Sequence, residues 1–375
     1  MDLKVIQVST KSDLKKFLYL PWKIYKGNDC WVPPLIKDLK DSLDDSKNPS
    51  MKKIKHVMYL ALLDGKPVGR IFAGIDNELN SKKGVMMGHF SLFECIDNYD
   101  VAKSLFDTAI KWFKENKIQI ARGPVSPTGT DDDESKGLLV NCFDQPPVIM
   151  NSYNPPYYKD FIERYGFTKD YDVFAYFLEP TDLFKKNPDK IIEYAKKKYN
   201  FTVESLSIKN IDKEVLDIKH VLDLAIPVEW PDLVPPSLEE IKGMVKKLLP
   251  YADPDLIILA RSEGEAIGFG LALPDYNQLL IHLNGRITPI SALKYLWYKR
   301  KINCARVFAM FVVPEFRKKG VSHAIYYQIF INGIKKGYKY GEASTIGETN
   351  VNMRKDIESI GAKHYKTYRI YSMKI

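Results

Sequence analysis

The chain has 375 residues, of which 45% are hydrophobic, 12% aromatic and 27% charged. This composition suits two or three globular domains and excludes a disordered or collagen-like chain. The longest apolar run, residues 307–313, is far shorter than the roughly 20 residues that cross a membrane. The N-terminus has no apolar stretch typical of a signal peptide. We therefore expect a cytoplasmic protein that does not enter a membrane.

The chain carries a net charge of +9, from 56 basic and 47 acidic residues. The basic residues form short, scattered clusters, without the stripe or motif of a nucleic-acid binder, so nucleic acid is not the expected partner. Four cysteines (Cys30, Cys95, Cys142 and Cys304) are widely spaced and form no C-x-x-C pair. This spacing predicts neither a metal centre nor a disulfide framework.

The hydrophobic pattern predicts alternating strands and helices along the first half of the chain. Two strands flank a turn at Gly65. The later elements are a strand at 89–95, a helix at 101–115, a strand at 118–123, a helix at 157–165 and a strand at 173–178. Residues 179–190 contain two prolines among polar residues and are typical of a boundary. We expect two domains, 1–180 and 181–375.

The second half shows a similar order. A helix at 191–198 and a strand at 201–208 precede helices at 213–225 and 237–249, and Ser237 with Glu240 forms a capping-box pattern. Two strands then flank a turn at Gly264. The last elements are a strand at 306–313, a helix at 322–336, a strand at 341–346, a helix at 351–359 and a strand at 364–373. The fold class is mixed α/β.

The two halves share landmarks at nearly one spacing. Gly65 and Gly264, the hairpin glycines, are 199 residues apart, and so are Gly69 and Gly268 in the strands that follow. Trp31 and Trp230 have the same spacing, and a glycine near the end of each half lies about 195 residues from its counterpart. Ordered landmarks at one offset predict two copies of one fold.

Residues 313–322, with the sequence VPEFRKKGVS, join a buried strand directly to a helix. The first amides of a helix have no partner within it, and the helix dipole is positive at that end. Three adjacent cations precede the helix, and Gly320 lets the backbone approach a ligand closely. This combination predicts an anion site that suits a phosphate.

The same segment resembles the pyrophosphate loop of the GNAT superfamily of acyl-CoA-dependent N-acyltransferases, whose usual form is R/Q-x-x-G-x-G/A. Arg317 and Gly320 match, and Ser322 stands at the final small position. The resemblance covers residues 201–375 well and the first copy in outline. It implies two tandem GNAT-like domains, each with a central mixed sheet flanked by helices.

The resemblance also implies a site. In this fold the strand before the loop parts from the next strand, and pantetheine lies in the gap. Phe311, Val312 and Val313 would then bind pantetheine through their backbone. Arg317, Lys318, Lys319, Gly320, Val321 and Ser322 would bind the pyrophosphate of acetyl-CoA or another acyl-CoA. Asn350, 11 residues before Gly361 as in the family, would orient pantetheine or water.

The chain departs from the family where proton transfer takes place. Many members of the family have a tyrosine that serves as the general acid for the thiolate, and Ile357 stands at its position here. Ala362 replaces the phenylalanine that follows the family's terminal glycine. An attacking amine must be neutral, which calls for a base. The strand at 306–313 has no carboxylate, so Glu348 is our candidate base, with Glu229 and His282 as weaker ones.

The first copy differs at the loop. Residues 95–101 are acidic and contain no glycine, so they should repel a pyrophosphate. We therefore expect only the second domain to hold acyl-CoA, and the first to have a substrate-side or structural role. The acidic segment 131–134 of the first copy could hold a cationic substrate.

Three functions fit these observations. The favoured one is transfer of an acetyl group from acetyl-CoA to an amine of a small molecule or peptide. A second is transfer of a long acyl or aminoacyl group, because tandem GNAT architectures also occur in myristoyl- and peptidoglycan-aminoacyl transferases. An aminoacyl-tRNA donor would make use of the positive charge. The third is a non-catalytic acyl-CoA sensor, which the missing tyrosine would suit.

Overall fold

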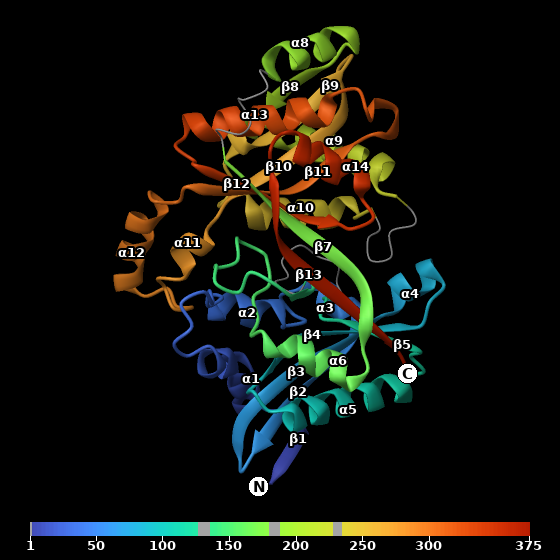
Figure 1. The fold of residues 1–375 in the computed structure, drawn as a ribbon, viewed down its shortest axis with the longest axis vertical. Coiled ribbons are helices and arrows are strands. Elements are labelled where there is room, and N and C mark those ends of the chain that lie inside the picture. The colour runs from blue at the N-terminus through green and yellow to red at the C-terminus, as the bar shows by residue number, and fades with distance from the viewer. Residues whose placement is uncertain (1, 127–135, 180–187, 228–234) are drawn as a thin grey trace. The chain divides into compact units, whose positions relative to one another are not determined.

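The computed structural model describes residues 2–126, 136–179, 188–227 and 235–375. The chain divides into two compact units (Figure 1). Unit 1 comprises Met1–Val173, Asn277–Arg300 and Lys366–Ile375, and unit 2 comprises Phe174–Tyr276 and Lys301–Tyr365. These units differ from a single division at residue 180, because two later segments of the chain belong to unit 1.

Unit 1 is built around a sheet with the strand order β1-β2-β3-β4-β5-β13. Its strands are β1 (Leu3–Gln7), β2 (Ile54–Leu63), β3 (Lys66–Asp76), β4 (Met87–Cys95), β5 (Ile120–Gly123), the short β6 (Leu138–Leu139), the first part of β7 (Thr168–Leu178) and the last part of β13 (Lys363–Lys374). Its helices are α1 (Lys11–Ile24), α2 (Ile36–Ser42), α3 (Pro49–Lys53), α4 (Asn77–Lys83), α5 (Tyr99–Glu115), α6 (Tyr157–Tyr165), α11 (Asn277–Leu280) and α12 (Pro289–Lys299).

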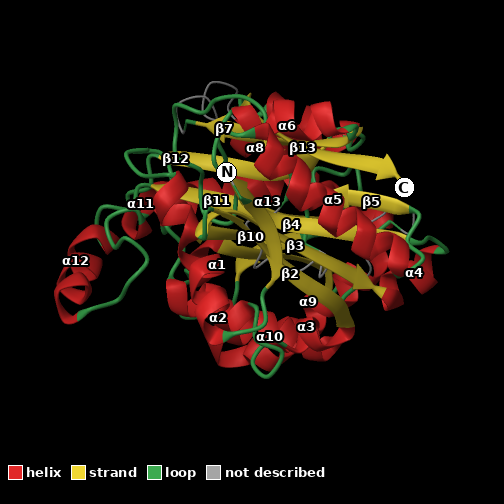
Figure 2. Ribbon diagram, turned by 90° about the horizontal axis from the view of Figure 1, so that it is seen from below, coloured by secondary structure: helices red, strands yellow, loops and turns green. Residues whose placement is uncertain are grey.

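Helices cover both faces of the unit 1 sheet (Figure 2). On one face Phe17 of α1 packs with Leu60 and Phe72, which alternate with residues facing the other side. On the opposite face α5 and α6 bury a larger aromatic core that includes Phe106 and Tyr158. The alternation of side chains along β2 and β3 thus supplies two cores from one pair of strands.

Unit 2 repeats the central pattern with the strand order β12-β11-β10-β9-β8. Its strands are β8 (Thr202–Ser205), β9 (Ile257–Ser262), β10 (Glu265–Pro274), β11 (Cys304–Val312) and β12 (Tyr340–Gly347), with parts of β7 and β13. Its helices are α8 (Pro188–Lys198), α9 (Ile211–Ala225), α10 (Leu238–Leu248), α13 (Val321–Lys335) and α14 (Val351–Ser359). Helix α13 packs against β9 and β10, and α9 packs against β10 and β11.

The predicted landmarks occupy matching places in the two units. Gly65 and Gly264 turn the β2–β3 and β9–β10 hairpins with φ angles of 77° and 88°. Gly166 and Gly361, also left-handed, follow α6 and α14 and lead into the last strand of each copy. The capping box at the start of α10 is present, with Ser237 and Glu240 bonded to each other's backbone amides. Trp230 lies outside the described residues.

The last strands of the two copies pass from one unit to the other. Residues 366–375 end the second half of the sequence, yet they belong to unit 1, where Tyr371 pairs with Gly123 of β5. Residues 174–178 end the first half and belong to unit 2. Each unit therefore needs residues from both halves of the sequence.

Replacement of Tyr371 by alanine tests this exchange. The Tyr371 side chain is fully buried in the aromatic core of unit 1, so Tyr371→Ala should lower the unfolding free energy of that unit by about 3–5 kcal/mol. Tryptophan fluorescence during urea unfolding reports mainly on unit 1, which contains four of the five tryptophans, Trp22, Trp31, Trp112 and Trp297. Lys374→Ala, at an exposed position of the same strand, is the control and should leave the transition unchanged. Equal transitions for both variants would contradict the exchange.

Candidate functional site

Two neighbouring strands of unit 2 part from each other in mid-course. Parallel pairing between β11 and β12 runs from Cys304 with Tyr340 to Val307 with Ala343 and ends there, although both strands continue. On its other side β11 stays paired with β10 as far as Val312. Residues 304–307 are buried, whereas residues 308–312 are partly exposed. The predicted parting of the two strands is therefore present, and Phe311, Val312 and Val313 lie along it.

The loop after β11 has a backbone shape that suits an anion. Val313 leads into a 3₁₀ turn, Pro314–Phe316, and Lys318 and Gly320 then adopt left-handed conformations with φ of 60° and 81°. Such alternation of conformations gathers successive N–H groups into a concave anion-binding nest. Gly320 is also the N-cap of α13 and provides no side-chain cap.

Six consecutive amides in this segment have no acceptor among the described residues. Within the described parts of the chain, the backbone N–H groups of residues 318–323 donate to no acceptor, whereas the amide of Ala324 begins the helical pattern by donating to the Gly320 carbonyl. An amide that lacks an acceptor is normally satisfied by water or by a ligand. The loop and the first turn of α13 therefore present a continuous row of donors.

Arg317 holds this loop in place through the backbone. Its Nε donates to the carbonyl of Val312 (3.2 Å), and its Nη2 donates to the carbonyl of Ala225 at the end of α9 (2.8 Å). The guanidinium thus ties the loop to β11 and to a helix C-terminus, where a cation is favoured by the helix dipole. The contacts of Arg317 are those of a residue that positions the loop.

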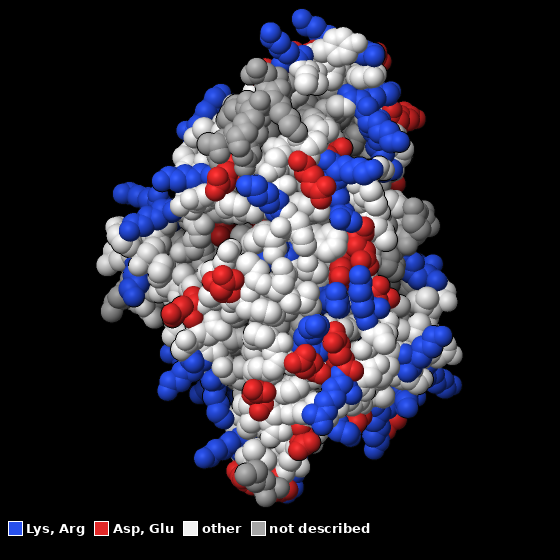
Figure 3. Space-filling model, in the orientation of Figure 1, with Lys and Arg blue, Asp and Glu red and all other residues white. Residues whose placement is uncertain are grey.

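The two lysines of the loop form no ion pair with the described residues. Lys318 is exposed, and the Lys319 ammonium lies 4.7 Å from the ring centre of Phe316 and 5.7 Å from that of Tyr199. Neither amine pairs with a carboxylate in the ranges that the structure describes. The loop therefore has two positive charges available for an anionic ligand. Over the visible face as a whole, Lys and Arg are interspersed with Asp and Glu (Figure 3).

The remaining predicted residues lie on α13 and around the start of α14. The hydroxyl of Ser322 donates to Asp356 (2.9 Å), which links α13 to α14. The side-chain oxygen of Asn350 accepts the Met353 amide (3.3 Å) and caps α14. Glu348 is partly buried in the turn between β12 and α14, where its carbonyl accepts a hydrogen bond from Arg354. Ile357, at the position of the family's tyrosine, is buried in the apolar core.

The other predicted candidates do not join this group. Glu229 and the acidic segment 131–134 lie outside the described residues. His282 belongs to unit 1 and stacks on Tyr298, with ring centres 3.8 Å apart. In the described ranges, no group of three or more His, Cys, Asp or Glu side chains is arranged to hold a metal, and no helix is long and apolar enough to span a bilayer.

Sequence reasoning missed a buried charged cluster at the point where β11 and β12 part. Arg306 and Glu342 are opposite each other in the strand register and are 0% and 1% exposed. Arg306 Nε donates to the Ser344 hydroxyl (2.8 Å), Nη2 donates to the Ser344 carbonyl (3.0 Å), and Tyr365 donates to Glu342. The signal was available, because an arginine in an apolar strand requires a buried partner.

The corresponding loop of unit 1, between β4 and α5, is acidic and caps its own helix. Only residues 96–98 separate β4 from α5, and the Asn98 side chain accepts the amide of Asp100. The helix N-terminus is therefore capped by the chain itself, and Asp97 and Asp100 add negative charge. These features oppose anion binding, in contrast to the uncapped N-terminus of α13.

Relatives of known sequence match nearly the whole chain. Protein YghO of Escherichia coli (strain K12) is 30% identical over 373 residues, which is 97% of this chain and 94% of YghO. The chain belongs to the YghO family. A second relative, the bacterial ceramide synthase of Caulobacter vibrioides (strain NA1000 / CB15N), is 29% identical over 386 residues, covering 99% of this chain and 97% of that protein. No protein-family model matches the chain.

Solved structures establish the fold. A tandem GNAT protein from the clavulanic acid biosynthesis pathway matches with a TM-score of 0.57 at 9% identity, covering 100% of this chain and 98% of that one. A GCN5-related N-acetyltransferase from Sphaerobacter thermophilus matches with a TM-score of 0.52 at 10% identity, covering 99% and 95%. This member of the YghO family has the tandem GNAT fold, which confirms the fold predicted from its sequence.

The Arg306–Glu342 cluster can be tested by a double-mutant cycle. Arg306→Met leaves a buried carboxylate without its cation, so unfolding of unit 2, followed by circular dichroism in denaturant, should require about 3–5 kcal/mol less free energy. The double variant Arg306→Met/Glu342→Leu should recover most of that loss, because no charge then stays buried. Two single variants whose effects simply add would contradict a coupled pair.

Proposed function

We propose that unit 2 binds an acyl-CoA and that the protein transfers the acyl group to an amine. The single observation that carries this proposal is the row of amides at 318–323, which the loop presents together with the amines of Lys318 and Lys319. A diphosphate has acceptor oxygens and negative charge for both kinds of group, and each charge-assisted hydrogen bond contributes about 1.5–3 kcal/mol.

The gap between β11 and β12 supports the same ligand. Beyond Val307 the edge of β11 is no longer paired with β12. Pantetheine is an extended chain with two amide groups, so it can add to a strand edge in the way a peptide does. The gap leads to the loop, because β11 ends at Val312 and the loop follows directly. One acyl-CoA would then use the strand edge and the loop together.

We further propose that the acyl group is a long chain and that the acceptor is a long-chain amino alcohol. The relative named a bacterial ceramide synthase supports this choice, because its match covers nearly the whole of both chains. A ceramide is an amide of a fatty acid with a long-chain amino alcohol. Its synthesis therefore requires the same bond formation as any N-acyl transfer.

The chemistry is the attack of a neutral amine on the thioester carbonyl. A C–N bond forms, the C–S bond breaks, the sulfur leaves as a thiolate, and the nitrogen loses a proton. An amine with a pKa of about 10.4 is almost wholly protonated at pH 7, so a base must take a proton before or during attack. Glu348 stays our candidate base, and Asn350 holds the turn that carries it by capping α14.

A transfer assay on the full-length protein tests this function. Acetyl-, octanoyl- and palmitoyl-CoA are each combined with a long-chain 2-amino-1,3-diol, with hexylamine and with a lysine peptide. Thiol release gives the rate, and mass spectrometry identifies the amide. We expect palmitoyl transfer to the amino diol. Exclusive acetyl transfer would contradict the proposed long acyl chain. CoA binding without turnover of any donor–acceptor pair would contradict the proposal that the protein is an enzyme.

Charge-neutral variants connect the activity to the loop. Lys318→Gln/Lys319→Gln should raise the KM for acyl-CoA about tenfold, because two charge contacts of up to about 1 kcal/mol each are lost. Lys246→Gln/Lys247→Gln removes two adjacent exposed charges of α10 and serves as the matched control. An equal change of KM in the two variants would show that the loop is not the binding site.

A further inference from the structure

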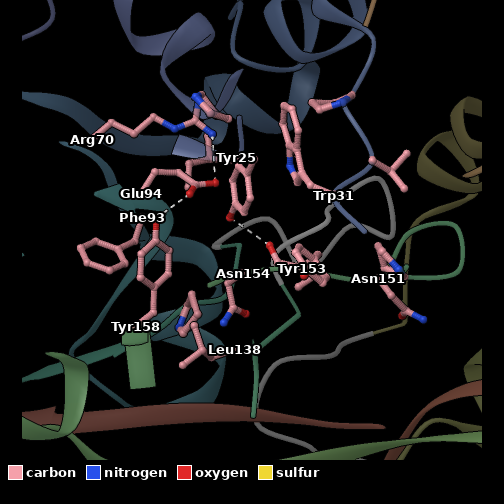
Figure 4. A pocket seen from close by; sticks show the side chains of 18 of the residues that line it. Tyr25, Trp31, Arg70, Phe93, Glu94, Leu138, Asn151, Tyr153, Asn154 and Tyr158 are labelled. Carbon is pink, nitrogen blue, oxygen red and sulfur yellow. Dashed lines mark hydrogen bonds and ion pairs between the residues drawn. The ribbon is translucent and has the colours of Figure 1, made fainter. Parts of the chain in front are cut away.

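Unit 1 contains a cavity of its own, with a volume of about 90 Å³ (Figure 4). Its lining comes from β3, β4, the end of α1, α6 and the segment after β6. Arg70, Glu94 and Tyr158 form one side, and Tyr25, Trp31 and Tyr153 form another. All of these residues belong to unit 1, so the cavity is complete within that unit.

The cavity lies where the two parallel strands of unit 1 part. Pairing between β4 and β5 covers only Met87 to His89 with Ile120 to Arg122. The cavity is lined by β4 residues beyond this pairing, Leu92 to Glu94, and by Pro124 beyond the end of β5. It thus occupies the place in unit 1 that corresponds to the β11–β12 gap in unit 2.

A buried carboxylate faces this cavity among three neighbouring polar side chains, Arg70, Tyr158 and Tyr25. Glu94 is 9% exposed, and its Oε2 accepts the hydroxyl of Tyr158 at 2.8 Å. Its Oε1 lies 3.8 Å from Nη2 of Arg70, which is too long for a hydrogen bond. The Tyr25 hydroxyl lies 3.2 Å from the Tyr153 carbonyl and is also a hydrogen-bonding neighbour of the Glu94 carboxylate, whose pKa this contact lowers. An ionised carboxylate has about four lone-pair sites, so Glu94 can accept a donor from a ligand in addition to these two tyrosines.

The charges around the cavity balance. Arg70 is 3% exposed, donates through Nη1 to the Phe17 carbonyl (2.8 Å) and offsets the charge of Glu94. Burial raises the pKa of Glu94, and Arg70 opposes that rise. A ligand with a net charge would disturb a pair that is already buried and neutral overall, at a high desolvation cost. An uncharged ligand that can donate and accept hydrogen bonds avoids this cost.

Aromatic rings form the apolar walls. Tyr25 and Trp31 stack in parallel, with ring centres 4.7 Å apart and an angle of 8° between the planes. Phe93 packs edge-on against Tyr158, with ring centres 5.0 Å apart. Flat rings beside a few fixed polar groups are typical of sites for small organic molecules. They bind the carbon skeleton while the polar groups bind its hydroxyls.

We propose that the cavity of unit 1 binds an uncharged, hydroxyl-bearing group, with Glu94 as the acceptor and the Tyr25–Trp31 stack as an apolar wall. The self-capped acidic loop after β4 excludes a diphosphate at this place. The first copy thus has the same strand gap as the second, but the residues that line it suit a different ligand. This binding does not depend on acyl transfer in unit 2.

Saturation-transfer NMR on the full-length protein, without acyl-CoA, tests the proposal. The three probes share a six-carbon chain and differ in the head group: 1-O-hexylglycerol, hexylamine and hexanoate. We expect saturation transfer to hexylglycerol to exceed that to either charged probe at least fivefold. Val32→Trp, which fills the cavity from a buried lining position, should abolish the difference. Ile334→Trp, at a partly exposed position of unit 2, should preserve it.

Glu94→Gln keeps the shape of the side chain and removes its charge. It should weaken hexylglycerol binding about fivefold, because charge-assisted hydrogen bonds are roughly twice as strong as neutral ones. This variant tests the proposal even if Val32→Trp fails to fold. Equal signals from all three probes, no signal from hexylglycerol, or unchanged binding in both folded variants would overturn the proposal. None of these outcomes bears on acyl transfer, because no acyl donor is present.

Discussion

The backbone amides of residues 318–323 need hydrogen bonds that the described chain does not provide. The conformation of the loop arranges these amides. Left-handed Lys318 and Gly320 turn the amides to one side, and Arg317 holds the loop through two carbonyls. A row of amides that is fixed before a ligand arrives loses little entropy when the ligand binds. In the proposed function, the backbone of the loop would contribute to anion binding as much as its charges do.

The fold presents the same strand gap twice, and the loops decide what each gap can take. In unit 2 the gap is followed by a helix without a side-chain cap and by two lysines that pair with no carboxylate among the described residues, a setting that favours a phosphorylated ligand. In unit 1 a self-capped helix and two aspartates follow it, and the polar groups of the gap lie inside, at Arg70 and Glu94. The two copies of one architecture thus have strand gaps with opposite electrostatic surroundings.

Local signals in the sequence predicted local structure well. The hairpin glycines, the capping box at Ser237 and the strand–loop–helix segment around Gly320 each depend on neighbouring residues, so the sequence pattern was sufficient. The assignment of the last strands was not predictable in this way, because Tyr371 pairs with Gly123 and no local pattern encodes a partner so distant in sequence. The predicted boundary near residue 180 therefore assigned the end of each half of the chain to the wrong unit.

The candidate site shows the same limit. The sequence predicted an anion site with Arg317 among its residues, but it did not predict that the guanidinium donates to the carbonyls of Val312 and Ala225. It also overlooked Glu342, because only the register between β11 and β12 brings that carboxylate to Arg306. Residue types can be recognised from spacing, but the partner of each side chain depends on tertiary structure.

Hydrogen–deuterium exchange of the full-length protein, with and without palmitoyl-CoA, tests the central claim most directly. The amides of residues 318–323 should exchange rapidly in the free protein, because they have no acceptor, and at least tenfold more slowly when the diphosphate binds them. Protection elsewhere in the chain, with unchanged exchange of these six amides under saturating ligand, would contradict the claim.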